Sequence, residues 1–374
     1  MLKSSICGAA LGAALGAACL AATAQSSVSI GGTMDVGVRH VKNGSLGSIT
    51  SEASGSNTTS KLVIRGNENL GDDLSAGFYL DATILGDTGQ AGAATPAGQL
   101  WDRRSTVSIA SKRLGELRLG RDWVPTHLVW SSMDPFTTLG IAGANSFRNF
   151  AASRALGQAF GALPDAAQAN PTLRVSNAVE YFLPGGLGGF YGHAVVTAGE
   201  NGTTATGFTR GNGFRLGWAG KGLDVGAAQF VTRNTNAGLD FKDQVLGAGY
   251  DFGFARLSVA QRRWVFGTDR SVNTLVAAQI PAGPGVVKLT YVRLDQKGAT
   301  AALSANDAHL IGAGYVYSFS KRTALYAHAS RISNDGAATF AVAGGPAVSA
   351  TPTAVNYFGG QRSTAYELGL RHDF

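Results

Sequence analysis

The last twelve residues of the chain alternate between apolar and polar side chains with a period of two. One parity holds Tyr366, Leu368, Leu370, His372 and Phe374, and the other holds Ala365, Glu367, Gly369, Arg371 and Asp373. A period of two places these sets on opposite faces of a β-strand. A short strand with one apolar and one polar face is typical of a transmembrane β-barrel. The stretch alone also fits the terminal strand of a soluble sandwich, so the rest of the chain must decide between them.

The same alternation recurs along most of the chain. We expect sixteen strands, within residues 27–41, 60–69, 74–84, 103–111, 114–123, 174–182, 190–198, 210–219, 223–232, 244–252, 255–264, 272–280, 285–295, 310–319, 323–332 and 363–374. Short turns such as 70–73 alternate with longer polar connections, for example 43–59. An even number of strands lets the last strand pair with the first and places both termini on the periplasmic side. The sequence therefore predicts an all-β, antiparallel transmembrane barrel of sixteen strands.

One connection breaks the alternation. Residues 123–172, between the fifth and sixth predicted strands, show no sustained period, although 151–162 is compatible with a helix. A connection of this length inside a compact domain is usually functional or disordered. We therefore treat it as a candidate part of the functional site.

The N-terminal residues read as a targeting segment. Lys3 precedes a run of Ala, Leu, Gly and Cys, and Ala22-Thr23-Ala24 has the form of a signal-peptide cleavage site. We expect a cleaved signal peptide over 1–24 and one barrel domain over 25–374. A lipoprotein anchor at Cys19 is disfavoured, because Gly16 stands where a bulky apolar residue is required. Both cysteines lie in this segment, so the predicted mature chain contains no disulfide.

Composition supports passage through a membrane by strands. The chain has 52 Gly and only 10 Pro, and no apolar run after Ala24 approaches the roughly 18 residues that a spanning helix needs. Lys and Arg number 31 against 24 Asp and Glu. This excess is modest for the length, so we expect no nucleic-acid partner.

Several stretches resemble the general porins of Gram-negative outer membranes, in particular the β-proteobacterial branch. They are SSVSIGG, SKLVIRGNENLGDDLSAGF, LGELRLGRDW, RVSNAVEYFLP, LGAGYDFG, IGAGYVYSFSKRTALYAHAS and ELGLRHDF. The resemblance implies a homotrimer in outer-membrane lipid and lipopolysaccharide, passive diffusion of small anionic or neutral solutes, and a third loop folded into the lumen. The family's Pro-Glu-Phe-Gly-like motif at the tip of that loop is absent, and the nearest string is Asp134-Pro135-Phe136.

The inward parity of the predicted strands is rich in bases. The inward bases are Arg39, Lys61, Arg65, Arg104, Arg118, Arg174, Arg215, Arg256, Arg262 and Lys288, and the inward acids are Asp35, Asp81, Glu116 and Glu180. Basic rings at a constriction favour anions, and the Arg fork binds carboxylate or phosphate in two places. The sequence therefore predicts a positive lumen and an anion preference.

From this set we select candidate pore-lining residues. They are Arg39, Arg65, Arg104, Arg118, Arg174 and Asp81 on the strands, with Asp134 and Asp165 of the long connection facing the arginine row across the lumen. The alternative for each Arg is a wall residue neutralised by a nearby acid.

The terminal strand carries a second candidate signal. In outer-membrane proteins generally, its aromatic pattern resembles the signal read by the barrel-assembly machinery. We assign this role to Phe374, Leu370, Leu368 and Tyr366.

Other functions are weaker predictions. An enzyme needs a nucleophile or activated water beside a base, and none of the six His lies in a Ser- or Asp-bearing cluster at a suitable spacing. No His/Cys cluster predicts a metal site, although the binding of Ca²⁺ by the loops remains an alternative. We therefore expect no cofactor. The main alternative within the barrel class is a substrate-specific channel for organic anions or phosphate.

Overall fold

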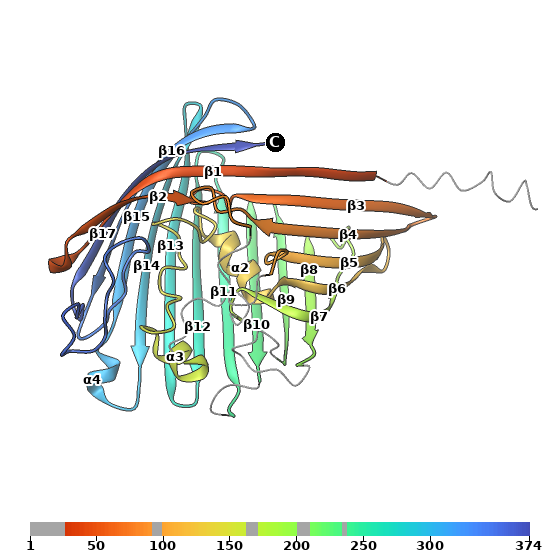
Figure 1. Cartoon of the computed structure of the whole chain (residues 1–374). Coiled ribbons are helices and arrows are strands. Elements are labelled where there is room, and N and C mark those ends of the chain that lie inside the picture. Colours follow the sequence, from red (N-terminus) through yellow and green to blue (C-terminus); the bar gives the residue numbers. More distant parts are fainter. Residues whose placement is uncertain (1–26, 92–98, 162–170, 200–209, 234–237) are drawn as a thin grey trace, which may run out of the picture.

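The computed structural model describes residues 27–91, 99–161, 171–199, 210–233 and 238–374, and the predicted signal peptide lies outside them. The described residues form one closed antiparallel sheet (Figure 1). Its strands are β1 (Ser27–Asn43), β2 (Ser48–Ser54), β3 (Lys61–Gly71), β4 (Leu74–Thr83), β5 (Arg104–Ser111), β6 (Gly115–Trp123), β7 (Arg174–Phe182), β8 (Phe190–Thr197), β9 (Gly211–Gly220), β10 (Leu223–Thr232), β11 (Phe241–Asp251), β12 (Arg256–Phe266), β13 (Asp269–Ala282), β14 (Gly285–Lys297), β15 (Ala308–Ser318), β16 (Thr323–Asn334) and β17 (Arg362–Asp373). The short helices are η1 (Gly44–Leu46), α2 (Pro125–Met133), α3 (Arg154–Phe160) and α4 (Ala301–Ser304).

These strands occupy sixteen positions around the barrel, because β2 and β3 share one. Residues 36–42 of β1 pair with β2, and residues 27–33 of the same strand pair with β3. The predicted sixteen-stranded barrel is therefore confirmed. The expectation that 43–59 is only a loop is wrong, since it contains β2. The strand was hidden because Ser48, Thr50 and Glu52 occupy the face that a spanning strand gives to lipid.

The barrel closes where β17 pairs with β1. Residues 33–43 of β1 pair with 363–373 of β17, and Phe374 extends the ladder by exchanging two backbone hydrogen bonds of 3.1 and 3.0 Å with Gly32. An ion pair of 2.9 Å between Arg39 and Glu367 crosses the same seam on the inner side. Closure satisfies the backbone groups of both edge strands, which the bilayer core cannot solvate.

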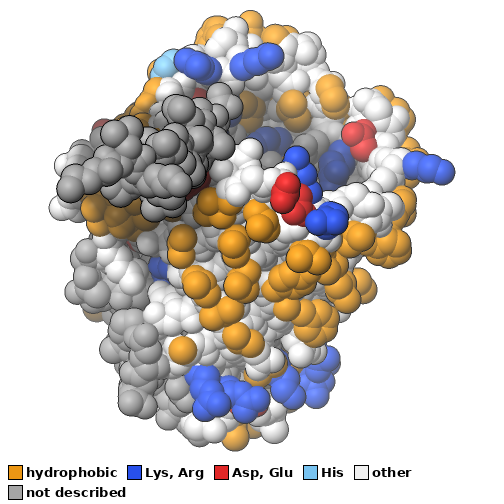
Figure 2. All heavy atoms as spheres, turned by 90° about the vertical axis from the view of Figure 1, so that its right-hand side faces the viewer, with side chains coloured by type: hydrophobic (Ala, Val, Ile, Leu, Met, Phe, Trp, Pro, Cys, Tyr) orange, Lys and Arg blue, Asp and Glu red, His pale blue; other side chains and the backbone are white. Residues whose placement is uncertain are grey.

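The outer face of the barrel is apolar, as the alternation predicts. In β17, Tyr366 is 58% exposed and Leu368 62%, whereas Glu367 between them is 5% exposed. Figure 2 shows apolar side chains spread over the visible wall, with Lys, Arg, Asp and Glu side chains around a hollow in the upper part and further Lys and Arg side chains along the lower edge. Apolar side chains thus face outward and most charges face the lumen.

The helices are all short. Within the described residues, no helix has the length and hydropathy needed to cross a membrane. The helix expected near 151–162 is confirmed as α3, whereas α2 was not predicted. The sequence offers little sign of α2, because it has nine residues and its N-cap residue, Val124, provides no capping side chain.

The position of Phe374 leads to a prediction about assembly. Deleting it removes both bonds to Gly32, so we expect a several-fold loss of assembled barrel in outer-membrane fractions, measured by heat-modifiable mobility. The channels that do form should keep normal conductance, because the Phe374 side chain is 52% exposed on the outer face. Phe374→Tyr keeps the aromatic end and both backbone bonds, and should assemble normally. Full insertion of the deletion variant would contradict this prediction.

Candidate functional site

The long connection between β6 and β7 folds into the barrel, as expected for the third loop. We call its described part, residues 124–161 and 171–173, the inner loop. In it, Trp130, Met133 and Phe136 are each 1% exposed. They join one apolar cluster with inward residues of β10 to β16, including Ala228, Val245, Ala260, Leu275, Ala277, Val292, Leu310 and Ile332. The inner loop therefore covers the apolar half of the inner wall, and water is left to the other half.

A second apolar cluster fixes the far part of the inner loop. Leu156 and Phe160 of α3 are buried against Phe241 of β11 and Trp264 of β12. The ring centroids of Phe160 and Phe241 lie 4.8 Å apart. Together the two clusters hold the loop from α2 to α3 against the wall.

A buried ion pair ties both ends of the inner loop to the wall. Arg262 of β12 and Asp243 of β11 are fully buried and lie 2.6 Å apart. Asp243 also accepts a hydrogen bond of 2.6 Å from the hydroxyl of Thr126, at the start of the loop. Arg262 donates one of 2.6 Å to the carbonyl of Thr172, at its end. We call this pair the loop clamp.

Asp134 stabilises the inner loop from within. Its carboxylate accepts hydrogen bonds from the amides of Phe136 (3.0 Å), Thr138 (2.8 Å) and Ala144 (2.7 Å). Burial raises the pKa of Asp134, an effect that the three donors oppose. The expectation that Asp134 faces the arginine row is not met, because the side chain is 2% exposed and turned into its own loop. Asp165 lies outside the described residues.

A second inward segment, residues 335–361 between β16 and β17, meets the inner loop. Phe340 is fully buried and packs edge-on against Phe147, with ring centroids 5.2 Å apart. The side-chain amide of Asn334 bonds both the amide (2.9 Å) and the carbonyl (2.9 Å) of Phe340. No periodic pattern marks this segment in the sequence, so its inward position was not predicted.

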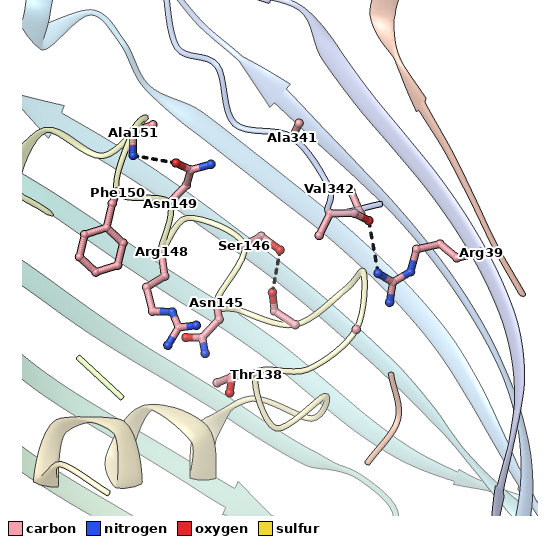
Figure 3. Close-up of a pocket in the computed structure, with 13 residues that line it drawn as sticks. Arg39, Thr138, Asn145, Ser146, Arg148, Asn149, Phe150, Ala151, Ala341 and Val342 are labelled. Carbon is pink, nitrogen blue, oxygen red and sulfur yellow. Dashed lines mark hydrogen bonds between the residues drawn. The ribbon is translucent and has the colours of Figure 1, made fainter. Parts of the chain in front are cut away.

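The two inward segments and β1 enclose a cavity of about 450 Å³. Figure 3 shows Arg39 reaching from the wall toward the loop segment that carries Asn145 and Arg148. The residues that line the cavity are Arg39, Thr138, Gly140, Gly143, Asn145, Ser146, Arg148, Asn149, Phe150, Ala151, Ala341, Val342 and Ala343. This set of described residues contains two Arg and neither Asp nor Glu. We call the cavity the arginine passage.

Arg39 is held in place by three partners. Its guanidinium contacts Glu367 (2.9 Å), the hydroxyl of Ser56 (2.8 Å) and the carbonyl of Ala343 (3.3 Å). The opposite oxygen of Glu367 bonds His328 at 2.9 Å. Glu367 therefore offsets the charge of Arg39, but its carboxylate does not line the cavity, so the guanidinium and not the acid faces it.

A second hollow, of about 520 Å³, lies against β1 and β3 to β5. Its described lining includes Arg65, Arg104, Tyr79 and Ser29, and again holds neither Asp nor Glu. The Arg104 guanidinium lies over the Tyr79 ring, 4.3 Å from its centroid. The structure thus places Arg39 in the first hollow and Arg65 and Arg104 in the second.

Three other predicted residues belong to a charged cluster on β4 to β7. Arg118 pairs with Glu116 (3.0 Å) and Asp122 (2.7 Å), and Asp81 pairs with Arg103 (3.1 Å). Arg174 is 5% exposed and lies over the Trp123 ring, 3.4 Å from its centroid. These side chains line neither hollow.

The predicted excess of inward bases overlooked several acids. Glu367, Asp122, Asp224 and Asp243 pair with Arg39, Arg104, Arg256 and Arg262, in that order. Arg256 and Arg262 thus fit the alternative of a wall residue neutralised by an acid, whereas Arg39 and Arg104 line hollows that their acid partners do not line. Arg148, which the selection missed, lies in a loop without periodicity, so no parity argument identified it.

Among the described residues, no three His, Cys, Asp or Glu side chains are grouped to hold a metal ion. His127, in α2, stacks on Trp123 with centroids 4.4 Å apart, and burial lowers its pKa well below the ordinary value.

Comparison with known proteins gives a consistent result. A family model described as Gram-negative porin matches residues 9–337. Outer membrane porin protein 32 of Delftia acidovorans is 34% identical over 373 residues, which cover 95% of this chain and 96% of that protein. An outer membrane porin protein of Bordetella pertussis is 25% identical over 359 residues, covering 84% of this chain and 82% of that protein.

A solved structure described as an anion-selective porin from Comamonas acidovorans is also similar. It superposes with a TM-score of 0.75 at 32% identity, covering 93% of this chain and 100% of that one. OmpT of Vibrio cholerae shares the fold, with a TM-score of 0.64 at 15% identity.

The loop clamp leads to a prediction about channel stability. Arg262→Met leaves Asp243 buried without its charge partner, a change that costs about 3–5 kcal/mol. We expect the inner loop to loosen and the open-channel current noise to rise severalfold in planar bilayers. Arg256→Met, on the same strand, removes a partly exposed pair at 3.5 Å that does not involve the loop. Equal noise in both variants would argue against the clamp.

Proposed function

The chain belongs to the Gram-negative porin family. From this premise we propose that it forms a passive outer-membrane channel and that its arginine passage gives the channel a preference for small anions. The observation that carries the preference is the lining of the passage. Arg39 and Arg148 reach it from opposite sides, and no carboxylate of the described residues lines it. Basic groups at the narrow part of a pore lower the energy of an entering anion.

The second hollow supports the same preference. Arg65 and Arg104 line it, and its described lining holds no acid, so an anion that leaves the arginine passage meets further positive charge. Low-dielectric walls concentrate such a field and raise the local concentration of counter-ions. The Comamonas structure at 32% identity, described as anion-selective, supports this proposal.

The acids described above set the strength of the preference. Most lumen arginines are paired, so the wall as a whole carries little net charge. Selectivity then depends on the few bases at the passage rather than on the total excess. We therefore propose a moderate preference that admits neutral solutes as well.

A substrate-specific channel for organic anions or phosphate is the second candidate. The stacking of Arg104 on Tyr79 favours it, because such a pair offers a carboxylate a donor beside a flat apolar surface. Liposome swelling separates the two proposals. A general porin admits neutral sugars and organic anions according to size, whereas a specific channel admits the anions far faster.

The expected partners follow from the family. We propose a homotrimer, with lipopolysaccharide around it and assembly by the barrel-assembly machinery through Tyr366, Leu368, Leu370 and Phe374. We propose no enzymatic activity and no cofactor. A trimer band in detergent that dissociates on heating supports the assembly, and a single monomer band under the same conditions contradicts it.

The arginine passage gives a direct prediction. The double variant Arg39→Gln/Arg148→Gln should lower the ratio of chloride to potassium permeability by about threefold or more, since two of the charges that attract anions are lost. The measurement is the zero-current potential across a bilayer in a KCl gradient. Arg113→Gln is the control, because Arg113 lies at the β5–β6 turn with its side chain 84% exposed. An unchanged potential in the double variant would refute the proposed role of the passage.

A further inference from the structure

Three ionisable side chains lie in register on the inner face of the barrel, across the strands where it closes. Arg39 of β1 lies opposite Glu367 of β17, and Glu367 lies opposite His328 of β16. The side chains of His328 and Glu367 are 0% and 1% exposed, whereas that of Arg39 is 13% exposed. We call these three residues the seam row.

Glu367 stands between the two bases of the seam row and bonds both. Its Oε2 lies 2.9 Å from both Nε and Nη2 of Arg39, and its Oε1 lies 2.9 Å from Nδ1 of His328. Because an ionised carboxylate only accepts hydrogen bonds, Nδ1 of His328 carries a proton. The other ring nitrogen, Nε2, is buried and has no hydrogen-bond partner among the described residues. Nε2 is therefore the atom that gains a proton when the imidazole becomes charged.

The surroundings of His328 can hold a positive charge. The ring of Tyr326 stacks on the imidazole with centroids 4.8 Å apart, and Phe136 of the inner loop packs at right angles to it at 5.1 Å. An aromatic face within about 6 Å attracts a cation. The hydroxyl of Tyr326 donates a hydrogen bond of 2.7 Å to the buried carboxylate of Asp35. A second acid thus lies behind the stacked ring.

The charged groups around His328 come from four elements. They are Arg39 and Asp35 on β1, Glu367 on β17, Lys288 on β14 and Asp134 in the inner loop. Lys288 lies in the same row of pairs, and its Nζ is 5.5 Å from the centre of the Phe136 ring. Arg371, further along β17, pairs with Asp373 at 3.6 Å. Three carboxylates therefore face two bases around His328, so a proton on the imidazole balances the charge.

Glu367 lies directly behind the wall of the arginine passage. Gly140 lines the passage, and a Cβ at this position would lie 2.8 Å from Oε1 of Glu367. The guanidinium of Arg39 lines the passage itself (Figure 3). While His328 is neutral, Glu367 offsets the charge of Arg39 alone. Once His328 is charged, the same carboxylate is divided between two cations, and more of the positive charge of Arg39 acts on the passage.

We propose that His328 is a positioning residue for Arg39, and that its protonation raises the anion preference of the channel at acid pH. The step adds one proton from lumen water to Nε2 and breaks no covalent bond of the protein. The imidazolium then competes with Arg39 for Glu367. Imidazole ordinarily gains its charge as the pH falls from about 8 to about 5. The inference rests on the proposed role of the arginine passage, because it describes how that preference is regulated.

The test is the zero-current potential of the channel in a KCl gradient, measured at about pH 8 and about pH 5. We expect the ratio of chloride to potassium permeability of the parent channel to rise about 1.5-fold or more at the lower pH, since one charge is added beside the passage. His328→Asn keeps an N–H donor near the position of Nδ1 but cannot titrate, so it should lose most of the rise. His40→Asn is the matched control, because His40 follows Arg39 on the exposed outer face of β1, and this variant should keep the rise.

A second variant tests whether His328 acts through the shared acid. Glu367→Gln removes the group for which the two bases compete, so its permeability ratio should be high at both pH values and change little between them. A rise in either His328→Asn or Glu367→Gln as large as that of the parent overturns the proposal.

The parent channel alone separates this inference from the proposed function. An anion preference at about pH 8 that does not increase at about pH 5 overturns the role of His328 and leaves the passage in place. The absence of any anion preference at both pH values contradicts the proposed function itself, and the regulation falls with it. Neither outcome depends on the folding of a variant.

Discussion

The packing of the inner loop on the apolar half of the inner wall determines where water can pass through this barrel. Trp130, Met133 and Phe136 are withdrawn from water against inward residues of β10 to β16. Burial of large apolar side chains stabilises by about 1.5–3 kcal/mol each, so the loop stays on this wall and not on the charged one. The loop clamp of Arg262 and Asp243 fixes the position of the loop along the wall, because it ties the two ends of the loop to adjacent strands. The conducting path is left to the other half.

The charges of the lumen follow from that division. On the charged half, arginines, acids and aromatic rings neutralise one another, which makes the wall polar but not strongly positive. The two hollows are different, because Arg39, Arg148, Arg65 and Arg104 line them and their described linings hold no acid. A channel of this kind selects by a few well-placed charges.

The sequence predicts the barrel well and the site only in part. Strand number, closure and outward faces follow from the period of two, because lipid and water impose opposite demands on alternate residues. Arg39, Arg65 and Arg104 were selected by that parity. Asp134 was misjudged, and Arg148 and the inward segment 335–361 were missed, because their positions depend on contacts between segments far apart in the chain. The parity argument also could not predict which arginines form ion pairs, because Glu367 and Asp243 become partners of arginines only when neighbouring strands come into register.

The inner loop divides the lumen into a covered and a conducting half. Reaction of single cysteines with a charged, water-soluble thiol reagent tests this division most directly, since both native cysteines lie in the predicted signal peptide. Asn145→Cys, in the arginine passage, should react rapidly and lower the conductance. Ala277→Cys, 5% exposed beneath the loop, should stay unmodified in the folded channel. Rapid reaction at residue 277, with a matching fall in conductance, would contradict the account.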